Sequence, residues 1–281
     1  MPELPEVETI ARGVNRRVCG DRIAEVWFCR YPQPFKTPAA AQIRGLVGKY
    51  LLDVHRTGKH IVCELGTAAT GQRGETTPPE AQWIVHLGMT GRLLVTTPEA
   101  PVAPHTHARL QLASGREIRF VDPRRFGRLE WRDLSRTAAF KAAGMEPLTI
   151  SAEEFRALFK GRKLAIKAAL LNQSLLTGVG NIYADESLFH AGIRPTRKAG
   201  RLTAEELERL RKSLQKVLRA AIKMGGSSVS DYVDAEGVRG FFQLEHCVYQ
   251  REGEACRQCQ TPVRRIVLAG RGTHFCPRCQ R

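Results

Sequence analysis

The chain has 281 residues, and its 44 lysines and arginines against 28 aspartates and glutamates give a formal net charge of +16. This length suits two domains with a substantial core, and the charge is typical of a protein that binds a phosphate backbone, with a generic cationic enzyme as the alternative. No run approaches the roughly 18 apolar residues of a membrane-spanning helix, and the acidic first ten residues exclude a secretory signal. We therefore expect a cytoplasmic protein with no membrane partner.

The N-terminus carries a candidate nucleophile. An initiator methionine before Pro2 is normally removed, which would expose a secondary amine that forms an iminium with an aldehyde. An α-amine has a pKa about two units below that of lysine, so much of it is nucleophilic at neutral pH. Glu3 could supply or withdraw protons. The alternative is that Pro5 simply starts a helix that runs to about Val18.

After this helix, residues 22–132 resemble a series of short strands, which predicts a β-sandwich or barrel. Ser114 and Gly115 predict a hairpin turn between two of them. Two segments rich in Pro, Thr, Ala and Gly, at 66–79 and 96–104, are expected to be surface loops. The expected strands include 61–65, 83–87, 109–112 and 117–121.

From about residue 150 the hydrophobic pattern becomes helical. Ser151 and Thr203 each precede a glutamate by three residues, a capping box that opens an amphipathic helix, and the second helix should run over 204–224. Helices are also expected over 164–172 and 183–190. The glycine-rich segment 177–181 suits either a phosphate site at a helix start or an ordinary tight turn.

Four cysteines at the C-terminus have the spacing of two zinc knuckles. They are Cys256, Cys259, Cys276 and Cys279. Four thiolates suit one tetrahedral structural Zn²⁺ with no open position for water, and two disulfides are the alternative. The residues between the knuckles should form strand over 261–268 and a turn over 269–272. The other four cysteines are scattered singly and indicate a reduced compartment.

Five motifs occur in order: PELPEVET at the N-terminus, HLGMTGRL at 86–93, DPRRFG at 122–127, GVGNIYADE at 178–186, and the four-cysteine hairpin. Together they resemble the bacterial formamidopyrimidine-DNA glycosylase family (Fpg/MutM), also called 8-oxoguanine DNA glycosylases. The resemblance implies an α+β fold in four parts. These are an N-terminal β-sandwich with a leading α-helix at 2–132, a linker at 133–150, a helix-two-turn-helix domain at 151–246 with a base-covering loop at 227–240, and a zinc β-hairpin at 247–281.

The resemblance also implies the chemistry. The amine of Pro2 would displace an oxidised purine, 8-oxoguanine or a formamidopyrimidine, from duplex DNA and leave a Schiff base, with Glu3 as proton donor. Lys59 would assist β-elimination and Arg271 δ-elimination, which leaves a one-nucleotide gap. Without the resemblance, Lys59 would be interpreted as a solvated loop lysine. One structural Zn²⁺ and no organic cofactor are expected, in a monomer that reaches the nucleoid through DNA.

Other positions that match the family's motifs would flip the base and hold the DNA. Met89, Arg124 and Phe126 match a wedge that fills the space left by the flipped base. The alternative for Met89 and Phe126 is a place in the core. The DNA contacts would be made by His105, Arg124, Arg162, Lys163, Lys167 and Asn181.

Three other functions account for part of the sequence. Relatives of the endonuclease VIII type excise oxidised pyrimidines, but they typically begin PEGPE and lack the long loop, whereas this chain begins PELPE and has residues 227–240. A non-catalytic zinc-hairpin DNA-binding protein would not need Pro2 and Glu3. A small-molecule enzyme with an N-terminal proline base would explain neither the charge nor the cysteines.

Overall fold

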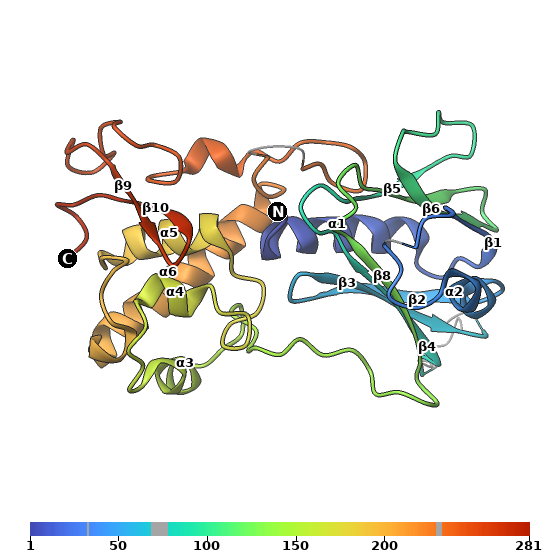
Figure 1. Cartoon of the computed structure of the whole chain (residues 1–281), viewed down its shortest axis with the longest axis horizontal. Coiled ribbons are helices and arrows are strands. Elements are labelled where there is room, and N and C mark those ends of the chain that lie inside the picture. The colour runs from blue at the N-terminus through green and yellow to red at the C-terminus, as the bar shows by residue number, and fades with distance from the viewer. Residues whose placement is uncertain (33, 69–77, 229–231) are drawn as a thin grey trace. The chain divides into compact units, whose positions relative to one another are not determined.

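A computed structural model describes residues 1–32, 34–68, 78–228 and 232–281. The chain forms two compact units (Figure 1). The first unit comprises residues 1–141 and 227–240, and the second comprises 142–226 and 241–281. The resemblance implies that the loop 227–240 belongs to the helical domain, whereas its contacts group it with the first unit. Much of the predicted loop 66–79 lies outside the described residues.

The first unit contains two antiparallel four-stranded sheets and the helices α1 (Leu4–Val18) and α2 (Ala39–Leu46). One sheet has the order β1 (Ile23–Phe28), β6 (Thr106–Leu112), β7 (Glu117–Val121) and β5 (Arg92–Thr96). The other has the order β2 (Tyr50–Thr57), β3 (His60–Gly66), β4 (Ala81–His86) and β8 (Arg128–Asp133). This arrangement confirms the predicted strands and the leading helix. The short helix α2 was not expected among the strands.

Helix α1 is part of the core of this unit. Val7, Ile10 and Val14 recur at helical spacing and are fully buried, in one cluster with Trp83 and Phe120 from the two sheets. The apolar face of α1 therefore fixes the helix against the sandwich. Its first residues, which carry the candidate nucleophile, are held in place by this packing.

The second unit is built from four α-helices, two short 3₁₀ helices and a C-terminal strand hairpin. Both predicted capping boxes are present, because the hydroxyls of Ser151 and Thr203 each accept the backbone N–H three residues later at 3.2 Å. The helix over 204–224 is confirmed as well. The elements are α3 (Ala152–Phe159), α4 (Ile166–Leu170), α5 (Asn181–Ala191), η1 (Ala199–Arg201), α6 (Ala204–Lys223), η2 (Phe242–Glu245), β9 (Arg264–Leu268) and β10 (Arg271–Phe275).

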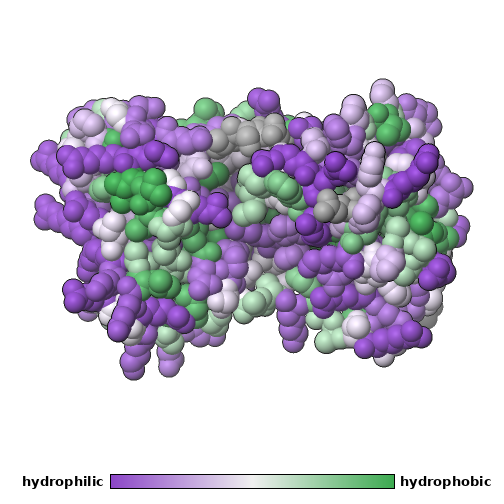
Figure 2. All heavy atoms as spheres, viewed as in Figure 1, coloured by the Kyte–Doolittle hydropathy of each residue, from purple (hydrophilic) through white to green (hydrophobic). Residues whose placement is uncertain are grey.

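The C-terminal hairpin turns at two residues rather than the four expected. Ala269 and Gly270 have φ values of +48° and +72°, and Arg271 is already the first residue of β10. Strand β9 begins at Arg264, so residues 261–263 are not strand. Figure 2 shows hydrophilic side chains over most of the visible face, with small hydrophobic patches between them. No helix in the described ranges has the length and apolar content to cross a bilayer.

Candidate functional site

The start of α1 places Pro2 and Glu3 in a buried position in the first unit. The backbone N–H of Glu3 donates to Glu6 Oε2 at 2.9 Å, and the N–H of Ser227 donates to Glu6 Oε1 at 2.7 Å. Glu6 is only 2% exposed. One carboxylate therefore fixes both the start of the helix and the start of the loop 227–240.

Further contacts attach the loop 227–240 to the same region. The hydroxyl of Tyr232 donates to the backbone oxygen of Glu6 at 3.4 Å. Ser228 Oγ donates to the backbone oxygen of Tyr232 and accepts the N–H of Gly240, both at 2.9 Å. Burial raises the pKa of Tyr232 well above its usual range, so its hydroxyl stays protonated. Residues 229–231, in the middle of the predicted base-covering loop, lie outside the described residues.

Lys59 lies at the tight turn between β2 and β3. Gly58 has a φ of +63°, and Lys59 is 9% exposed. Arg56 connects this turn to α1, because its guanidinium donates to the backbone oxygen of Gly58 at 3.2 Å and to Glu8 Oε2 at 2.7 Å. Burial opposes ionisation of Glu8, yet Arg56 and Arg12 hold its pKa below the usual value. The buried position of Lys59 does not fit a solvated loop lysine.

The three wedge residues lie on two loops that pack together. Met89, after β4, is 41% exposed, and Phe126, between β7 and β8, is 48% exposed. The guanidinium of Arg124 lies 4.8 Å from the centre of the Phe126 ring. Neither Met89 nor Phe126 belongs to the core, so the alternative from the sequence does not apply. An exposed apolar pair beside a cation is suited to contact with stacked bases.

A buried aspartate organises these two loops. Asp122 is fully buried and accepts the hydroxyl of Thr90 at 2.6 Å, the N–H of Gly127 at 2.7 Å and the N–H of Arg124 at 3.3 Å. A Cβ added to Gly88, which has a φ of +62°, would lie 2.5 Å from the carbonyl carbon of Phe126. These contacts thus hold the two loops that carry Met89, Arg124 and Phe126 against each other. The sequence did not single out Asp122, although it opens the DPRRFG motif.

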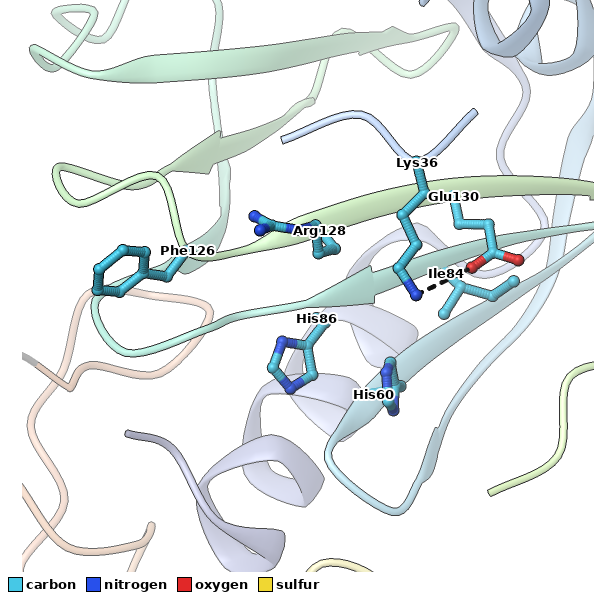
Figure 3. A pocket seen from close by; sticks show the side chains of 7 residues that line it. All are labelled: Lys36, His60, Ile84, His86, Phe126, Arg128 and Glu130. Carbon is cyan, nitrogen blue, oxygen red and sulfur yellow. Dashed lines mark ion pairs between the residues drawn. The ribbon is translucent and has the colours of Figure 1, made fainter. Parts of the chain in front are cut away.

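A pocket of about 280 Å³ lies beside the wedge (Figure 3). The rings of His60 and His86 face each other there with centroids 4.7 Å apart. Burial lowers the pKa of His60 to about 4, and burial followed by the charge of Lys59 lowers that of His86. Both imidazoles are therefore neutral at pH 7. Neither was singled out from the sequence, and the pocket lining comprises Lys36, His60, Ile84, His86, Phe126, Arg128 and Glu130.

A second hollow of about 740 Å³ in the same unit contains His105. His105 is exposed, with a φ of +63°, and its backbone oxygen accepts the N–H of Asp122 at 3.0 Å. Arg125 lies over the ring of Tyr31 at 5.1 Å, and Trp27 is 48% exposed on the same rim. Exposed aromatic and cationic side chains are thus gathered around His105.

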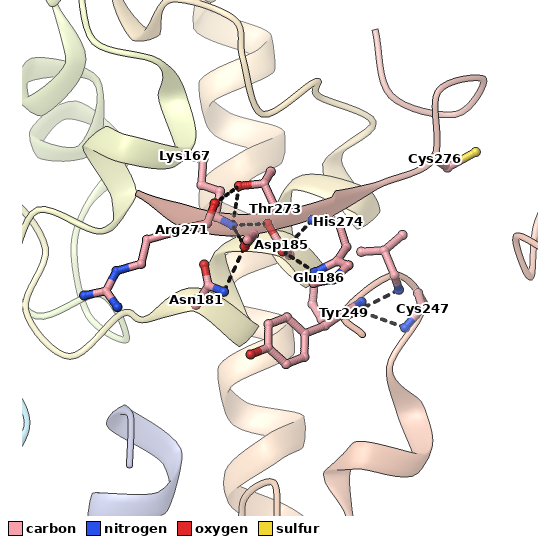
Figure 4. A network of polar contacts seen from close by, with 12 residues as sticks. Lys167, Asn181, Asp185, Glu186, Cys247, Tyr249, Arg271, Thr273, His274 and Cys276 are labelled. Atoms are coloured by element: carbon pink, nitrogen blue, oxygen red, sulfur yellow. Dashed lines mark hydrogen bonds and ion pairs between the residues drawn. The ribbon is translucent and has the colours of Figure 1, made fainter. Parts of the chain in front are cut away.

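In the second unit the predicted DNA contacts fall into two groups. Arg162 and Lys163, after α3, and Arg271, at the start of β10, are exposed. Lys167 is fully buried, and its Nζ lies 2.8 Å from Asp185 Oδ1 and donates to the backbone oxygen of Gly272 at 2.9 Å (Figure 4). An ammonium paired inside the protein is not placed to hold a phosphate. The structure therefore favours a positioning role for Lys167.

Asn181 takes part in the same network. It is the first residue of α5, and its Nδ2 donates to the backbone oxygen of Gly272 at 3.0 Å. Asp185 Oδ2, on the same helix, accepts the backbone N–H of His274 at 2.9 Å. Lys167, Asn181 and Asp185 therefore hold β10 along its length. The exposed side chain of Arg271 starts from this fixed strand.

The neighbouring acid on α5 holds the other side of the hairpin. Glu186 is buried and accepts the backbone N–H groups of Cys247, Val248 and Tyr249 at 2.8–3.0 Å. Burial raises the pKa of Glu186, and the three N–H donors oppose that rise. Two consecutive carboxylates thus bind the segments that precede the two knuckles, because Glu186 binds the one before Cys256 and Asp185 the one before Cys276.

The four C-terminal cysteines converge as a metal site requires. Cys256 Sγ lies 3.9 Å from Cys279 Sγ, and Cys259 Sγ lies 3.4 Å from Cys276 Sγ. These distances exceed the ~2.05 Å of a disulfide bond and suit the edges of a tetrahedron around zinc. All four sulfur atoms lie within 4.8 Å of one another. The residues therefore fit a structural zinc ion held by four thiolates.

Comparison with known protein families gives three matches along the chain. Residues 1–129 match the formamidopyrimidine-DNA glycosylase N-terminal domain, and residues 143–233 match the formamidopyrimidine-DNA glycosylase H2TH domain. Residues 253–281 match the zinc finger found in FPG and IleRS. Among similar proteins, the formamidopyrimidine-DNA glycosylase of Solibacter usitatus is 42% identical over 285 residues, and that of Prochlorococcus marinus is 41% identical over 294 residues. In both cases the match covers 100% of each chain.

Solved structures give the same result. A Lactococcus lactis FPG mutant bound to Fapy-dG-containing DNA matches with a TM-score of 0.88 and 33% identity over 100% of both chains. MutM bound to DNA containing carbocyclic 8-oxo-G matches with a TM-score of 0.87 and 33% identity, also over 100% of both chains. A complex of L. lactis Fpg with an abasic-site DNA matches with a TM-score of 0.88 and 33% identity over 99% of both chains.

Proposed function

Because the chain belongs to the formamidopyrimidine-DNA glycosylase family, and is thus a DNA glycosylase that acts on damaged DNA, we propose that it excises oxidised purines and then cleaves the strand as a lyase. The observation that carries the proposal is the buried start of α1. There Pro2 and Glu3 precede a helix whose Glu6 also binds the loop 227–240. Nucleophile, proton donor and base-covering loop are thereby linked in one unit.

In the first step, the secondary amine of Pro2 attacks C1′ of the damaged nucleotide. The new bond joins this nitrogen to C1′, the N-glycosidic bond breaks, and the base leaves with a proton. Opening of the sugar ring, with a proton delivered to its oxygen by Glu3, leaves an iminium between Pro2 and C1′. This step requires that Met1 be removed, because an amide nitrogen is not nucleophilic.

The strand is then cleaved by two eliminations. The iminium acidifies the C2′ hydrogen, so loss of that proton expels the 3′-phosphate, and a second elimination expels the 5′-phosphate. We assign β-elimination to Lys59, and its position at the turn that Arg56 connects to α1 supports this assignment. Arg271 serves δ-elimination as an exposed phosphate clamp, since its guanidinium does not lose a proton at neutral pH.

The wedge and the cationic residues prepare the substrate. A base inside a duplex is inaccessible at C1′, so the nucleotide must be flipped out and the space filled, which the exposed Met89, Arg124 and Phe126 are suited to do. We assign His105, Arg162 and Lys163 to phosphate contacts, which set affinity and salt dependence. Zinc held by the four cysteines supplies structure, because four thiolates leave it no open position. One chain carries every assigned residue, in keeping with a monomer.

Borohydride trapping tests this proposal. The processed protein is mixed with a duplex that carries one 8-oxoguanine opposite cytosine, reduced with borohydride, and mapped by intact mass and peptide analysis. We expect a covalent adduct on Pro2. The matched control is the same chain prepared so that Met1 is not removed. This control should give no adduct on Pro2. If the processed chain gave no adduct with an 8-oxoguanine duplex and none with an oxidised-pyrimidine duplex, the catalytic assignment would be refuted.

A second substrate class has a specific observation in its favour. A wild-type L. lactis Fpg, 33% identical to this chain with a TM-score of 0.87, was crystallised with an oxidised-pyrimidine-containing DNA. The same trapping on a duplex with one oxidised pyrimidine separates the two candidates. Faster adduct formation with 8-oxoguanine supports oxidised purines as the main substrate. The reverse order would assign this chain the pyrimidine activity.

A further inference from the structure

Helix α5 carries a second cluster of metal-ligating side chains in the second unit. Glu186 and His190 are one helical turn apart, and Cys247 comes from the segment after η2. One ligand atom from each lies within 4.8 Å of the others, and Cys247 Sγ lies 3.8 Å from His190 Nε2. The proposed glycosylase chemistry uses neither His190 nor Cys247.

We propose that Glu186, His190 and Cys247 form a second metal site, for a thiophilic divalent cation such as Zn²⁺, separate from the four-cysteine site. Residues four apart on a helix lie on the same face, so α5 presents the carboxylate and the imidazole together. Typical Zn–S and Zn–N bonds of about 2.3 and 2.0 Å give a tetrahedral S–N edge of about 3.5 Å. The observed 3.8 Å needs little adjustment to reach that value.

Glu186 keeps capacity for a metal although it already binds three backbone groups. Its Oε1 accepts the N–H groups of Val248 and Tyr249, and its Oε2 accepts that of Cys247 within the described part of the chain. An ionised carboxylate has about four lone-pair positions, so one remains on Oε2. The backbone donors also orient the carboxylate, which is what outer partners do for a metal ligand.

The other two ligands have suitable chemistry. They are an imidazole and a thiol, both established zinc ligands, whose Nε2 and Sγ atoms lie 3.8 Å apart. His190 is exposed, which gives an ion a path to the cluster. On binding, the S–H bond of Cys247 breaks, the sulfur–metal bond forms, and the proton passes to water. Water would take the fourth position, so this site should be weaker than the four-thiolate site.

The cluster is continuous with the zinc hairpin. Cys247 packs against the apolar cluster that contains Phe189, Val248, Cys256 and Cys276. A metal bound to Cys247 would therefore brace the segment that leads into the first knuckle, which Glu186 already holds. The inference does not depend on excision activity, since it concerns metal binding alone.

Metal stoichiometry of the full-length protein tests the site. The zinc-loaded protein is dialysed against buffers of rising free Zn²⁺, and bound zinc is measured by mass spectrometry. We expect about two ions per chain for the wild type at saturation, and about one for Cys247→Ser and for His190→Gln. A variant that keeps the first ion still has a folded hairpin, so its loss of the second ion does not come from misfolding. His190→Gln adds a milder test, because it changes only an exposed side chain.

Two further measurements make the test specific. Cys19→Ser, which removes an exposed cysteine in the first unit, should keep both ions. A second Co²⁺ equivalent should show sulfur-to-cobalt charge transfer in the wild type and lose it in Cys247→Ser. A wild-type protein that saturates at one ion, or a second ion that persists in both variants, would overturn the proposal.

Discussion

Asp122 in the first unit and Asp185 in the second are both fully buried, yet they are compensated in different ways. Asp122 accepts a hydroxyl and two backbone N–H groups, with no cation among these donors. Asp185 pairs with the ammonium of Lys167 and accepts the N–H of His274. The first arrangement shapes two loops that carry exposed side chains. The second locks two segments together inside the protein.

The difference predicts how each unit responds to loss of a partner. The Asp122 carboxylate is stabilised by several hydrogen bonds from neutral donors, so no single donor supplies most of its stabilisation. The Lys167–Asp185 pair instead depends on each charge for the other, because an unpaired charge in the interior is costly. The largest effects should therefore come from the second unit.

Lys167→Met should have the largest effect. It leaves Asp185 buried without its cation, and the expected loss is about 3–5 kcal/mol of unfolding free energy. Calorimetry of the full chain, with hydrogen exchange on peptides from 264–275, measures the loss and locates it. Lys163→Met, an exposed neighbour, should change stability by less than about 0.5 kcal/mol and lower the salt slope of DNA binding by about one. Equal destabilisation by both substitutions would contradict a buried pair.

Asp122→Asn should have an intermediate effect. The amide keeps the shape of the carboxylate but cannot accept from Thr90 and Gly127 in the same way, so we expect a loss of about 1–3 kcal/mol. Chemical denaturation measures it, and Asp53→Asn on an exposed strand position is the matched control. Slower excision should accompany the loss, because both wedge loops depend on Asp122. Wild-type stability in Asp122→Asn would show that the three hydrogen bonds do not organise these loops.

Phe126→Ala should have the smallest effect on stability. Its ring is 48% exposed, so unfolding free energy should change by less than about 0.5 kcal/mol beyond the weak contact with Arg124. Excision from duplex DNA should still slow about tenfold or more, because the ring offsets the unstacking of the flipped base. Single-turnover kinetics measures this, with Phe241→Ala, a phenylalanine 57% exposed in the second unit, as control. Equal excision rates for Phe126→Ala and Phe241→Ala would contradict the assignment of Phe126 to the wedge.

The sequence predicted what depends on local pattern. Capping boxes at Ser151 and Thr203, the hairpin turn at Gly115 and the cysteine knuckles are each specified within a few residues, and the structure contains them. The helix α2 was not predicted, because it is only eight residues long and lies among strands.

The sequence could not predict which polar residues are buried. The resemblance implied a DNA contact for Lys167, and its burial could not be predicted because one of its acceptors, Gly272, lies 105 residues away. Glu6 and Ser227 are 221 residues apart, so no local signal revealed that they share a hydrogen bond. Exposure of Met89 and Phe126 likewise depends on how two distant loops pack, which sequence spacing does not specify.

The close approach at Gly88 limits how this protein can diverge. Any side chain there would collide with the backbone of Phe126, so the two wedge loops share one fixed separation. An insertion or deletion in either loop would have to be matched in the other to keep that separation. The pair should therefore be inherited as a unit, and grafting one loop alone from a relative should fail where grafting both succeeds.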